Sequence, residues 1–274
     1  MTVNSEQVEY WNGGAGETWV AYQERLDRQL DPLGRAALAA LGPRSGEHIL
    51  DVGCGGGQTT FQLAEAVGPG GRVVGIDISQ PLLSAAAKRN QDAHVSFLRA
   101  DAQAHVFEHP FDAIYSRFGV MFFADPVRGF ANLRRSLKPR GRIAFVCWRA
   151  ESENPIMTVP LAAAAKHLPA LPPPPDPTAP GPFAFADDKR LARILDEAGF
   201  RAISITPHDE AIGGNDRAVT LELALRIGPL GRLLREHPEQ TAAVVDAVRD
   251  ALEAFIAGGV ARLPSATWIV TATS

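Results

Sequence analysis

The segment ILDVGCGGGQTT, residues 49–60, combines an acidic residue with closely spaced glycines. Asp51 ends an apolar run, and Gly53, Gly55 and Gly57 follow at alternate positions before a helical pattern begins. Glycines at such a turn permit positive φ and let the backbone approach a ligand closely. The start of the helix also offers free N–H groups to a carboxylate. The segment therefore predicts a ligand-binding turn.

The spacing of these glycines bears on the kind of ligand. The nicotinamide fingerprint G-x-G-x-x-G needs a third glycine where this chain has Gln58. An acidic residue two positions before the first glycine, here Asp51, is also not part of that fingerprint. An NAD-dependent oxidoreductase is therefore the less favoured alternative.

Two more acidic residues follow β-rich runs. Asp77 ends RVVGID at 72–77, and Asp101 follows HVSFLRA at 94–100. A carboxylate only accepts hydrogen bonds and so suits a pair of vicinal hydroxyls. The alternative is that both residues are N-caps of helices in a generic α/β domain.

Together with LKPRGRIAFV at 137–146, these motifs resemble the class I S-adenosylmethionine-dependent methyltransferases, close to the ubiquinone/menaquinone-biosynthesis-like group. The resemblance is clear from Ile49 to Trp148. It implies that the glycine turn holds the methionine part of the cofactor, that Asp77 binds the ribose hydroxyls, and that Asp101 with the backbone of Ala102 contacts adenine. The cofactor-binding residues that it implies are Gly53, Cys54, Gly55, Gln58, Thr59, Asp77, Ile78, Asp101, Ala102, Ser116 and Phe118.

The reaction that the resemblance implies is methyl transfer to a small-molecule acceptor by in-line displacement. Aligning the reacting atoms can contribute on the order of 7–11 kcal/mol, so a dedicated base is optional, and the sequence shows none. A protein of the same fold that keeps the cofactor without transferring the methyl group stays as a second alternative.

Aromatic and charged residues near the expected site are weaker signals. Similar proteins use an amino-terminal helix as a lid, so Trp11 and Trp19 could cover the cofactor, although core packing explains them equally well. The segment after the fourth strand places Arg117, Met121 and Phe122 beside the cofactor, either as pocket lining or as core.

Composition and the remaining reactive residues exclude other functions. The net charge of −4 over 274 residues argues against nucleic acid or an anionic membrane as a partner. There is no signal-peptide pattern and no run of about 18 apolar residues, so we expect a cytoplasmic protein. His105 and His109 stand four apart but are interpreted as solvated or capping residues, with no metal site. The strand order that the resemblance implies places Cys54 and Cys147 two strand spacings apart, beyond disulfide reach.

Short β-rich runs alternate with helical stretches through the centre of the chain, which predicts a parallel sheet covered on both faces. The runs lie at 48–52, 72–77, 94–100, 111–116 and 142–148. The resemblance extends this to a Rossmann-like, doubly wound sheet of seven strands, six parallel and the last antiparallel.

We expect a single methyltransferase domain over 1–274. Within it, 1–42 is an N-terminal helical lid, 43–150 the cofactor-binding core, 168–185 a stiff Pro-rich connection, and 209–263 a helical insertion before the last strand.

A minimal fold of this kind joins its last two strands, here 200–207 and 266–273, by a short hairpin, so the insertion is unusually long. It contains an apolar stripe at helical spacing: Val245, Val248, Leu252, Phe255 and Ile256. We expect the insertion, with this stripe as one apolar face, and the Pro-rich connection to roof an apolar acceptor pocket above 117–123. The alternative use of the stripe is a homodimer interface.

Overall fold

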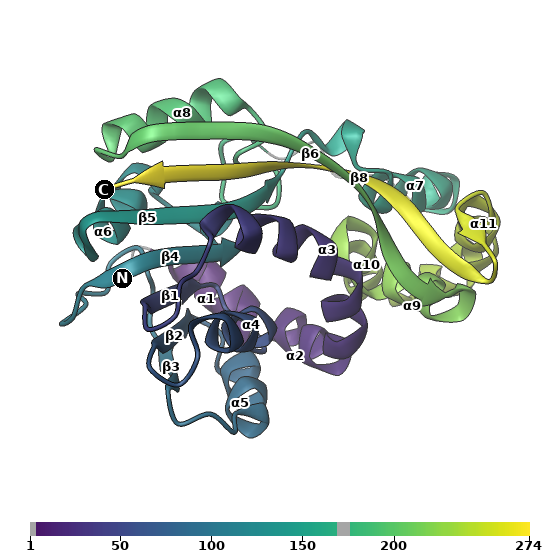
Figure 1. The fold of residues 1–274 in the computed structure, drawn as a ribbon. Coiled ribbons are helices and arrows are strands. Elements are labelled where there is room, and N and C mark those ends of the chain that lie inside the picture. The colour runs from purple at the N-terminus through teal and green to yellow at the C-terminus, as the bar shows by residue number, and fades with distance from the viewer. Residues whose placement is uncertain (1–3, 169–175) are drawn as a thin grey trace.

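The computed structural model describes residues 4–168 and 176–274, and its centre is one mixed sheet (Figure 1). Along the sheet the strand order is β3-β2-β1-β4-β5-β8-β6, with β7 paired to β8. The strands are β1 (His48–Val52), β2 (Arg72–Asp77), β3 (Val95–Arg99), β4 (Phe111–Arg117), β5 (Leu137–Trp148), β6 (Arg201–Asp216), β7 (Ile256–Ala257) and β8 (Val260–Thr273).

Strand directions follow the pattern that the resemblance implied. β1 to β5 pair in parallel, and β8 is antiparallel to both β5 and β6. β6 therefore runs with β5, which gives six parallel strands and one antiparallel strand in the main order. The two-residue β7 is an addition that the sequence did not predict.

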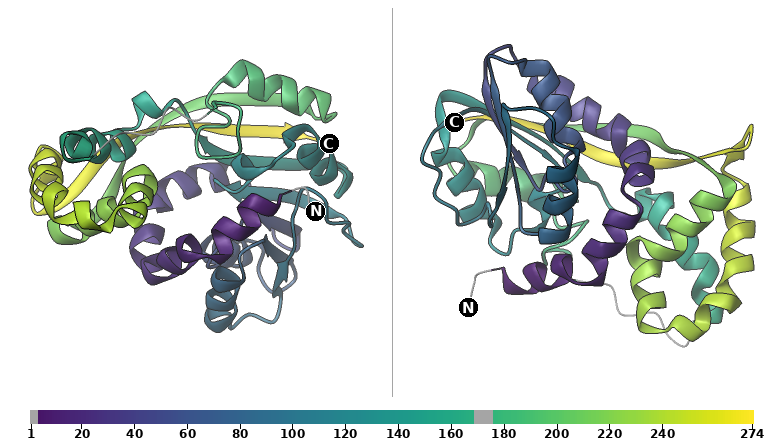
Figure 2. Two further views of the ribbon diagram at one scale, coloured as in Figure 1. Left: turned by 180° about the vertical axis from the view of Figure 1, so that it is seen from behind. Right: turned by 90° about the horizontal axis from the view of Figure 1, so that it is seen from below.

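Helices cover both faces of the sheet (Figures 1 and 2). On one face lie α3 (Gln23–Leu41), α4 (Gln58–Val67) and α5 (Gln80–Arg89), and on the other α6 (Pro126–Arg135) and α8 (Asp188–Glu197). Right-handed crossovers between parallel strands produce this division. Short 3₁₀ turns complete the chain: η1 (Val120–Phe122), η2 (Glu151–Glu153), η3 (Ala165–His167) and η4 (Pro238–Gln240).

Side-chain caps set where several helices begin. The Ser79 hydroxyl accepts from the N–H of Leu82, and the carboxylate of Asp125 accepts from the N–H of Arg128. Each cap satisfies an N–H that has no partner within its helix. These two starts agree with the sequence prediction, in which prolines occupy the first turns.

The amino-terminal region is only partly separate from the core. α3 packs along the sheet and buries Leu26, Leu30, Leu33, Ala37 and Leu41, so it is a core helix rather than part of a lid. Helices with one continuous apolar face gain most from covering a sheet. Only α1 (Ser5–Asn12) and α2 (Gly14–Ala21) remain for the lid predicted over 1–42.

The insertion is shorter than the predicted range 209–263. β6 and β8 continue to pair as a two-stranded ribbon as far as Asp216 and Val260. The helical part is α9 (Arg217–Arg226), α10 (Gly228–Glu236) and α11 (Thr241–Glu253). Backbone pairing carries polar residues into a strand here, which side-chain patterns alone did not indicate.

The apolar stripe of α11 faces a helix that the sequence did not predict. Val244, Val248 and Leu252 are buried in a small second core with Ala164 of α7 (Pro155–Ala164), whereas Val245 is only half-buried. α7 therefore covers most of this face of α11, and the roof or dimer interface expected of the insertion stays a prediction.

The helical group of α7, α9, α10 and α11 lies at one end of the molecule (Figures 1 and 2). The arrow of β8 points away from it, so the parallel strands run toward it and end on its side (Figure 1). In the Pro-rich connection, 169–175 lies outside the described residues. Its last part turns back onto the sheet, where Phe185 is buried beside Phe130.

The remaining reactive residues lie apart from one another. Cys147, on β5, and Cys54, in the turn after β1 rather than on that strand, are free and buried. His109 is exposed, while the ring of His105 packs edge-on against Phe107. In the two described ranges, no three His, Cys, Asp or Glu residues are grouped so that they could hold a metal ion.

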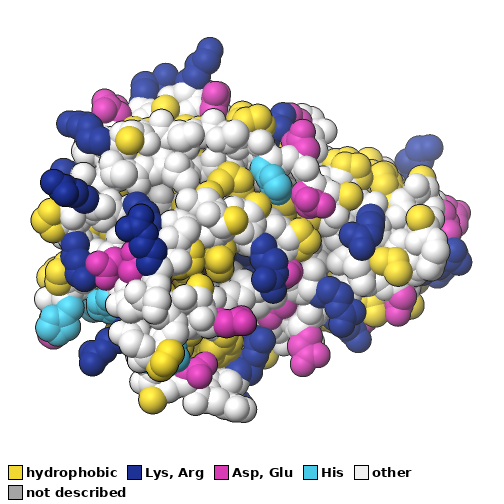
Figure 3. Space-filling model, viewed as in Figure 1, with side chains coloured by type: hydrophobic (Ala, Val, Ile, Leu, Met, Phe, Trp, Pro, Cys, Tyr) yellow, Lys and Arg dark blue, Asp and Glu magenta, His cyan; other side chains and the backbone are white. Residues whose placement is uncertain are grey.

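None of the helices in the described ranges has both the length and the apolar character needed to cross a membrane. Lys and Arg side chains are interspersed with Asp and Glu on the face shown in Figure 3.

Candidate active site

The residues that the sequence singled out meet at the carboxyl edge of the parallel strands. Asp51 lies beside Gly75 of β2 and Tyr115 of β4 in the sheet register. Asp77 ends β2, and Asp101 follows β3, the next strand outward. Open α/β sheets bind ligands at this edge, at the point where the strand order reverses, and here that point lies between β1 and β4.

The glycines of the turn are required for different reasons. A Cβ on Gly53 would lie 2.6 Å from the Cα of Gly119, so Gly53 makes room for the segment after β4. A Cβ on Gly55 would have no protein atom within 4 Å, although the φ of 53° still disfavours other residues there. Gly55 is therefore where the turn borders open space. Gly119 is a partner that the sequence analysis missed.

Asp51 is a buried carboxylate with only half of its acceptors in use. One oxygen, Oδ2, accepts hydrogen bonds from the hydroxyls of Thr59 and Thr60, both at 2.7 Å. The other oxygen, Oδ1, is buried without a partner. Burial raises the pKa of Asp51 to about 6, although the two hydroxyls and the charge of Arg117 oppose the shift. A positively charged or hydrogen-bond-donating group would be stabilised at this position.

Asp77 is held in a fixed orientation by the backbone. Its two oxygens accept from the N–H groups of Gly55 and Ser79, each at 2.8 Å. Burial raises its pKa, and these backbone donors oppose the rise. The N-cap of the following helix is Ser79, so the helix-cap alternative for Asp77 is wrong. Each oxygen keeps a further lone pair for a ligand hydroxyl.

The predicted adenine-contacting segment forms a turn rather than a helix. Asp101 accepts from the N–H of Gln103 at 2.9 Å, and the carbonyl of the buried Ala102 accepts from Asn132. The carbonyl of Ile78, just beyond β2, accepts from Asn12 of the amino-terminal segment at 3.0 Å.

Two predicted residues at the end of β4 shape the floor of the edge. The hydroxyl of Ser116 donates to the carbonyl of Val52 at 2.8 Å and so joins β4 to the turn. Phe118 has a φ of 63°, which is strained for a side chain of this size. Its ring stacks on that of Trp148, with 4.4 Å between centroids and 7° between planes. Strained backbone of this kind concentrates at functional sites.

Other predicted residues have side chains that turn inward. The hydroxyl of Thr59 serves Asp51, the Cys54 thiol is buried with a raised pKa, and Met121 is almost fully buried. Trp11 packs edge-on against Trp19 at 5.7 Å and against Phe122 at 5.5 Å. These side chains therefore support the site by packing against other parts of the protein.

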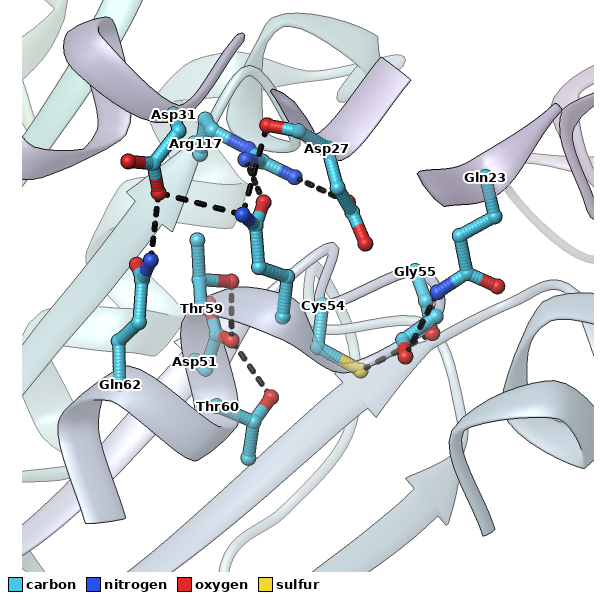
Figure 4. A network of polar contacts seen from close by, with 12 residues as sticks. Gln23, Asp27, Asp31, Asp51, Cys54, Gly55, Thr59, Thr60, Gln62 and Arg117 are labelled. Carbon is cyan, nitrogen blue, oxygen red and sulfur yellow. Dashed lines mark hydrogen bonds and ion pairs between the residues drawn. The ribbon is translucent and has the colours of Figure 1, made fainter. Parts of the chain in front are cut away.

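Sequence analysis missed a row of polar residues on α3. Gln23, Asp27 and Asp31 are spaced four apart and face the glycine turn and the start of α4 (Figure 4). We call these three residues the polar stripe of α3. Gln23 and Asp27 extend the buried face that Leu30, Gly34 and Ala37 continue, so polar residues at core positions of an amphipathic helix were the available signal.

The site residues fit the cofactor that the resemblance implies. The Oδ1 of Asp51 is buried without a partner, and the turn that follows Asp51 in the chain borders open space at Gly55. The first turn of α4 has no side-chain cap, so its N–H groups remain available to a carboxylate. S-adenosylmethionine carries an ammonium, a carboxylate and ribose hydroxyls, and Asp51, α4 and Asp77 offer the complementary groups.

Comparison with known proteins gives the same class. Residues 49–141 match the family model described as a methyltransferase domain. An O-methyltransferase of Penicillium expansum is 30% identical over 219 residues, which cover 78% of this chain and 74% of the relative. A demethylmenaquinone methyltransferase of Lactococcus lactis is 35% identical over 123 residues, covering 43% of this chain and 47% of the relative.

Solved structures agree on the fold. Phosphoethanolamine N-methyltransferase 2 of Haemonchus contortus, in complex with S-adenosyl-L-methionine, aligns with a TM-score of 0.60 at 18% identity, covering 100% of this chain and 60% of that one. Several curated relatives match this chain over only about half of their own length.

Proposed function

We propose a reaction for this chain on the premise that it belongs to the class I S-adenosylmethionine-dependent methyltransferases, in their quinone/menaquinone-type group. The reaction is methyl transfer to a small-molecule acceptor by in-line displacement. The observation that carries it is the buried, unpaired Oδ1 of Asp51, followed in the chain by a turn that borders open space at Gly55. The free, buried thiols of Cys54 and Cys147 support a reducing, cytoplasmic location.

Each site residue has a separate task in this proposal. Asp77, oriented by two backbone donors, accepts from the ribose hydroxyls, and Asp51 faces the ammonium group. When bound, S-adenosylmethionine supplies a methyl group already activated on a sulfonium. The chain then has to hold the acceptor in line with the methyl group and to exclude water. Alignment of the reacting atoms can by itself lower the barrier substantially. The stacked pair of Phe118 and Trp148 offers a rigid apolar wall for that purpose.

We assign α1 and α2 to a lid over the adenosine end of the site. The segment docks beyond Asp77, where the Ser79 hydroxyl donates to the carbonyl of Trp11 at 2.7 Å and Asn12 accepts from the N–H of Gln80 at 2.9 Å. These contacts tie the segment to the loop that follows Asp77. A lid in this place would exclude water from the bound cofactor.

We assign the helical group of the insertion to a cap on the acceptor side. It lies at the edge toward which the parallel strands run, and Glu222 of α9 accepts from both Tyr22 and Arg25, each at 2.7 Å. In the last part of the Pro-rich connection, the N–H of Gly181 donates to the carbonyl of Met121. The aromatic side chains of Phe118 and Trp148 favour a mostly apolar acceptor. This agrees with relatives named for O-methylation and for demethylmenaquinone.

Calorimetry and a transfer assay test this proposal. Titration with S-adenosylhomocysteine should show binding, and titration with NAD should not. A panel of quinols and hydroxylated aromatic compounds, incubated with S-adenosylmethionine, should then yield S-adenosylhomocysteine with at least one acceptor. Absence of S-adenosylhomocysteine binding would overturn the proposal, whereas binding without turnover on the whole panel would favour a cofactor-binding protein of the same fold.

A further inference from the structure

Besides the pair of Asp31 with Arg35 on its own helix, the polar stripe of α3 contacts the glycine turn, α4 and two arginines. The amide of Gln23 donates to the carbonyl of Gly56 at 2.9 Å. Asp27 accepts from Arg117 through one oxygen and from Arg89 through the other, both at 3.3 Å. Arg89 also donates to the carbonyl of Gly56 at 3.0 Å. One helix thus contacts the turn directly and through a second side chain.

Arg117 is held at the first residue of α4. Its other donor bonds the side-chain oxygen of Gln58, and the amide nitrogen of Gln58 donates to Asp31 at 3.2 Å. Figure 4 shows Arg117 lying between Asp27 and the start of α4, with Asp31 on the far side. The guanidinium is therefore tied to the first residue of α4, a helix whose N-terminus has no side-chain cap.

Packing alone does not account for these residues. Gln23 and Asp27 are 7% and 8% exposed, on a helix whose other buried positions are apolar. Burying polar and charged groups is costly unless every partner is in place. The stripe is therefore costly for the fold, while the contacts of Gln23 and Asp27 reach the glycine turn and, through Arg117, the start of α4.

We propose that Asp27 is a positioning residue, which keeps Arg117 against Gln58 and Arg89 against Gly56 and so shapes the wall of the cofactor site. This inference rests on the proposed function. Asp27 acts through Arg117, because a second carboxylate, that of Asp51, competes for the same guanidinium. Asp51 carries a buried oxygen without a donor and lies within electrostatic reach of the guanidinium. Without Asp27, Arg117 would shift from Gln58 toward Asp51, and the first residue of α4 would lose the contact that fixes it.

A double-mutant cycle tests the inference through binding rather than turnover. Calorimetric titration with S-adenosylhomocysteine compares the wild type, Asp27→Asn, Arg117→Gln and the double variant. Each single variant should bind about tenfold more weakly or worse, since a charge-assisted contact is lost. The double variant should bind within about twofold of the weaker single variant, because the two residues act as one unit.

Glu47→Gln is the matched control. Glu47 makes a comparably buried ion pair with Arg142, at 2.8 Å, but at the opposite edge of the sheet. This variant should lower the melting temperature and leave the affinity unchanged.

Three results would overturn the inference: Asp27→Asn binding within about twofold of the wild type, fully multiplicative losses in the double variant, or an equal loss in Glu47→Gln. A wild type that does not bind would instead overturn the proposed function.

Discussion

The clearest physical consequence of the site is that Asp51 destabilises the fold that carries it. Burial raises the pKa of this carboxyl from 3.8 to about 6. A difference of about two pH units corresponds to about 3 kcal/mol between the protonated and ionised forms. The ligand-free protein should be stabilised by protonated Asp51 below pH about 4. That stabilisation should disappear as the pH rises through about 6, because the folded state then loses a proton that it held more tightly than the unfolded chain.

Asp51→Asn removes this titration and nearly preserves the shape. Relative to the wild type, the variant should gain up to about 3 kcal/mol of unfolding free energy between pH 4 and pH 7. An amide nitrogen at the Oδ1 position would lack an acceptor and offset part of the absolute gain, about 1–3 kcal/mol, at every pH. Asp77 is present in both proteins, so its own raised pKa cancels in the difference. The pH dependence of the difference is therefore the informative quantity.

Urea unfolding followed by circular dichroism, from pH 4 to pH 8, measures this pH dependence of the stability difference. Asp112→Asn is the control of opposite sign. Its carboxylate accepts from Lys138 and from the N–H of His48, and these contacts hold its pKa below the usual value. Asp112→Asn should therefore lose stability relative to the wild type as the pH rises out of the acid range. A stability difference for Asp51→Asn that stays flat with pH, with Asp112→Asn behaving as expected, would refute the electrostatic argument.

Three substitutions and one deletion test the rest of the site. Gly55→Ala should fold but bind S-adenosylhomocysteine at least about tenfold more weakly by calorimetry, since it fills open space; Gly53→Ala should instead lower the melting temperature or prevent folding, and the reverse pattern would exchange the two roles. Deleting residues 1–20 should weaken S-adenosylhomocysteine binding more than it lowers the melting temperature if they form a lid, and a loss of stability alone would make them a brace. Glu222→Gln should lower the pKa of Tyr22, which the hydrogen bond to this carboxylate raises; ultraviolet titration of the tyrosines that shows no change would contradict the contact.

Local patterns in the sequence predicted the sheet and its binding edge. Short apolar runs, acidic residues at their ends and glycines between them are all signals within about ten residues along the chain, and backbone geometry converts them directly into strands and turns. Asp51, Asp77 and Asp101 therefore came from the sequence, and the structure brings them to one edge of the sheet. The helical stripe of α11 was recognised as apolar for the same reason, but its partner was not.

What the sequence alone determined was which elements form and which residues stand at their ends. Tertiary structure decided which faces meet: α7 covers α11, Gly119 takes the space beside Gly53, and Asp27 meets Arg117. Contacts of this last kind join residues 90 positions apart. Polar residues at core positions of α3 indicated that they have partners, but no local pattern identified those partners. Only when α3 packs against the sheet do these carboxylates lose water and take the arginines as partners, so their role exists only in the folded chain.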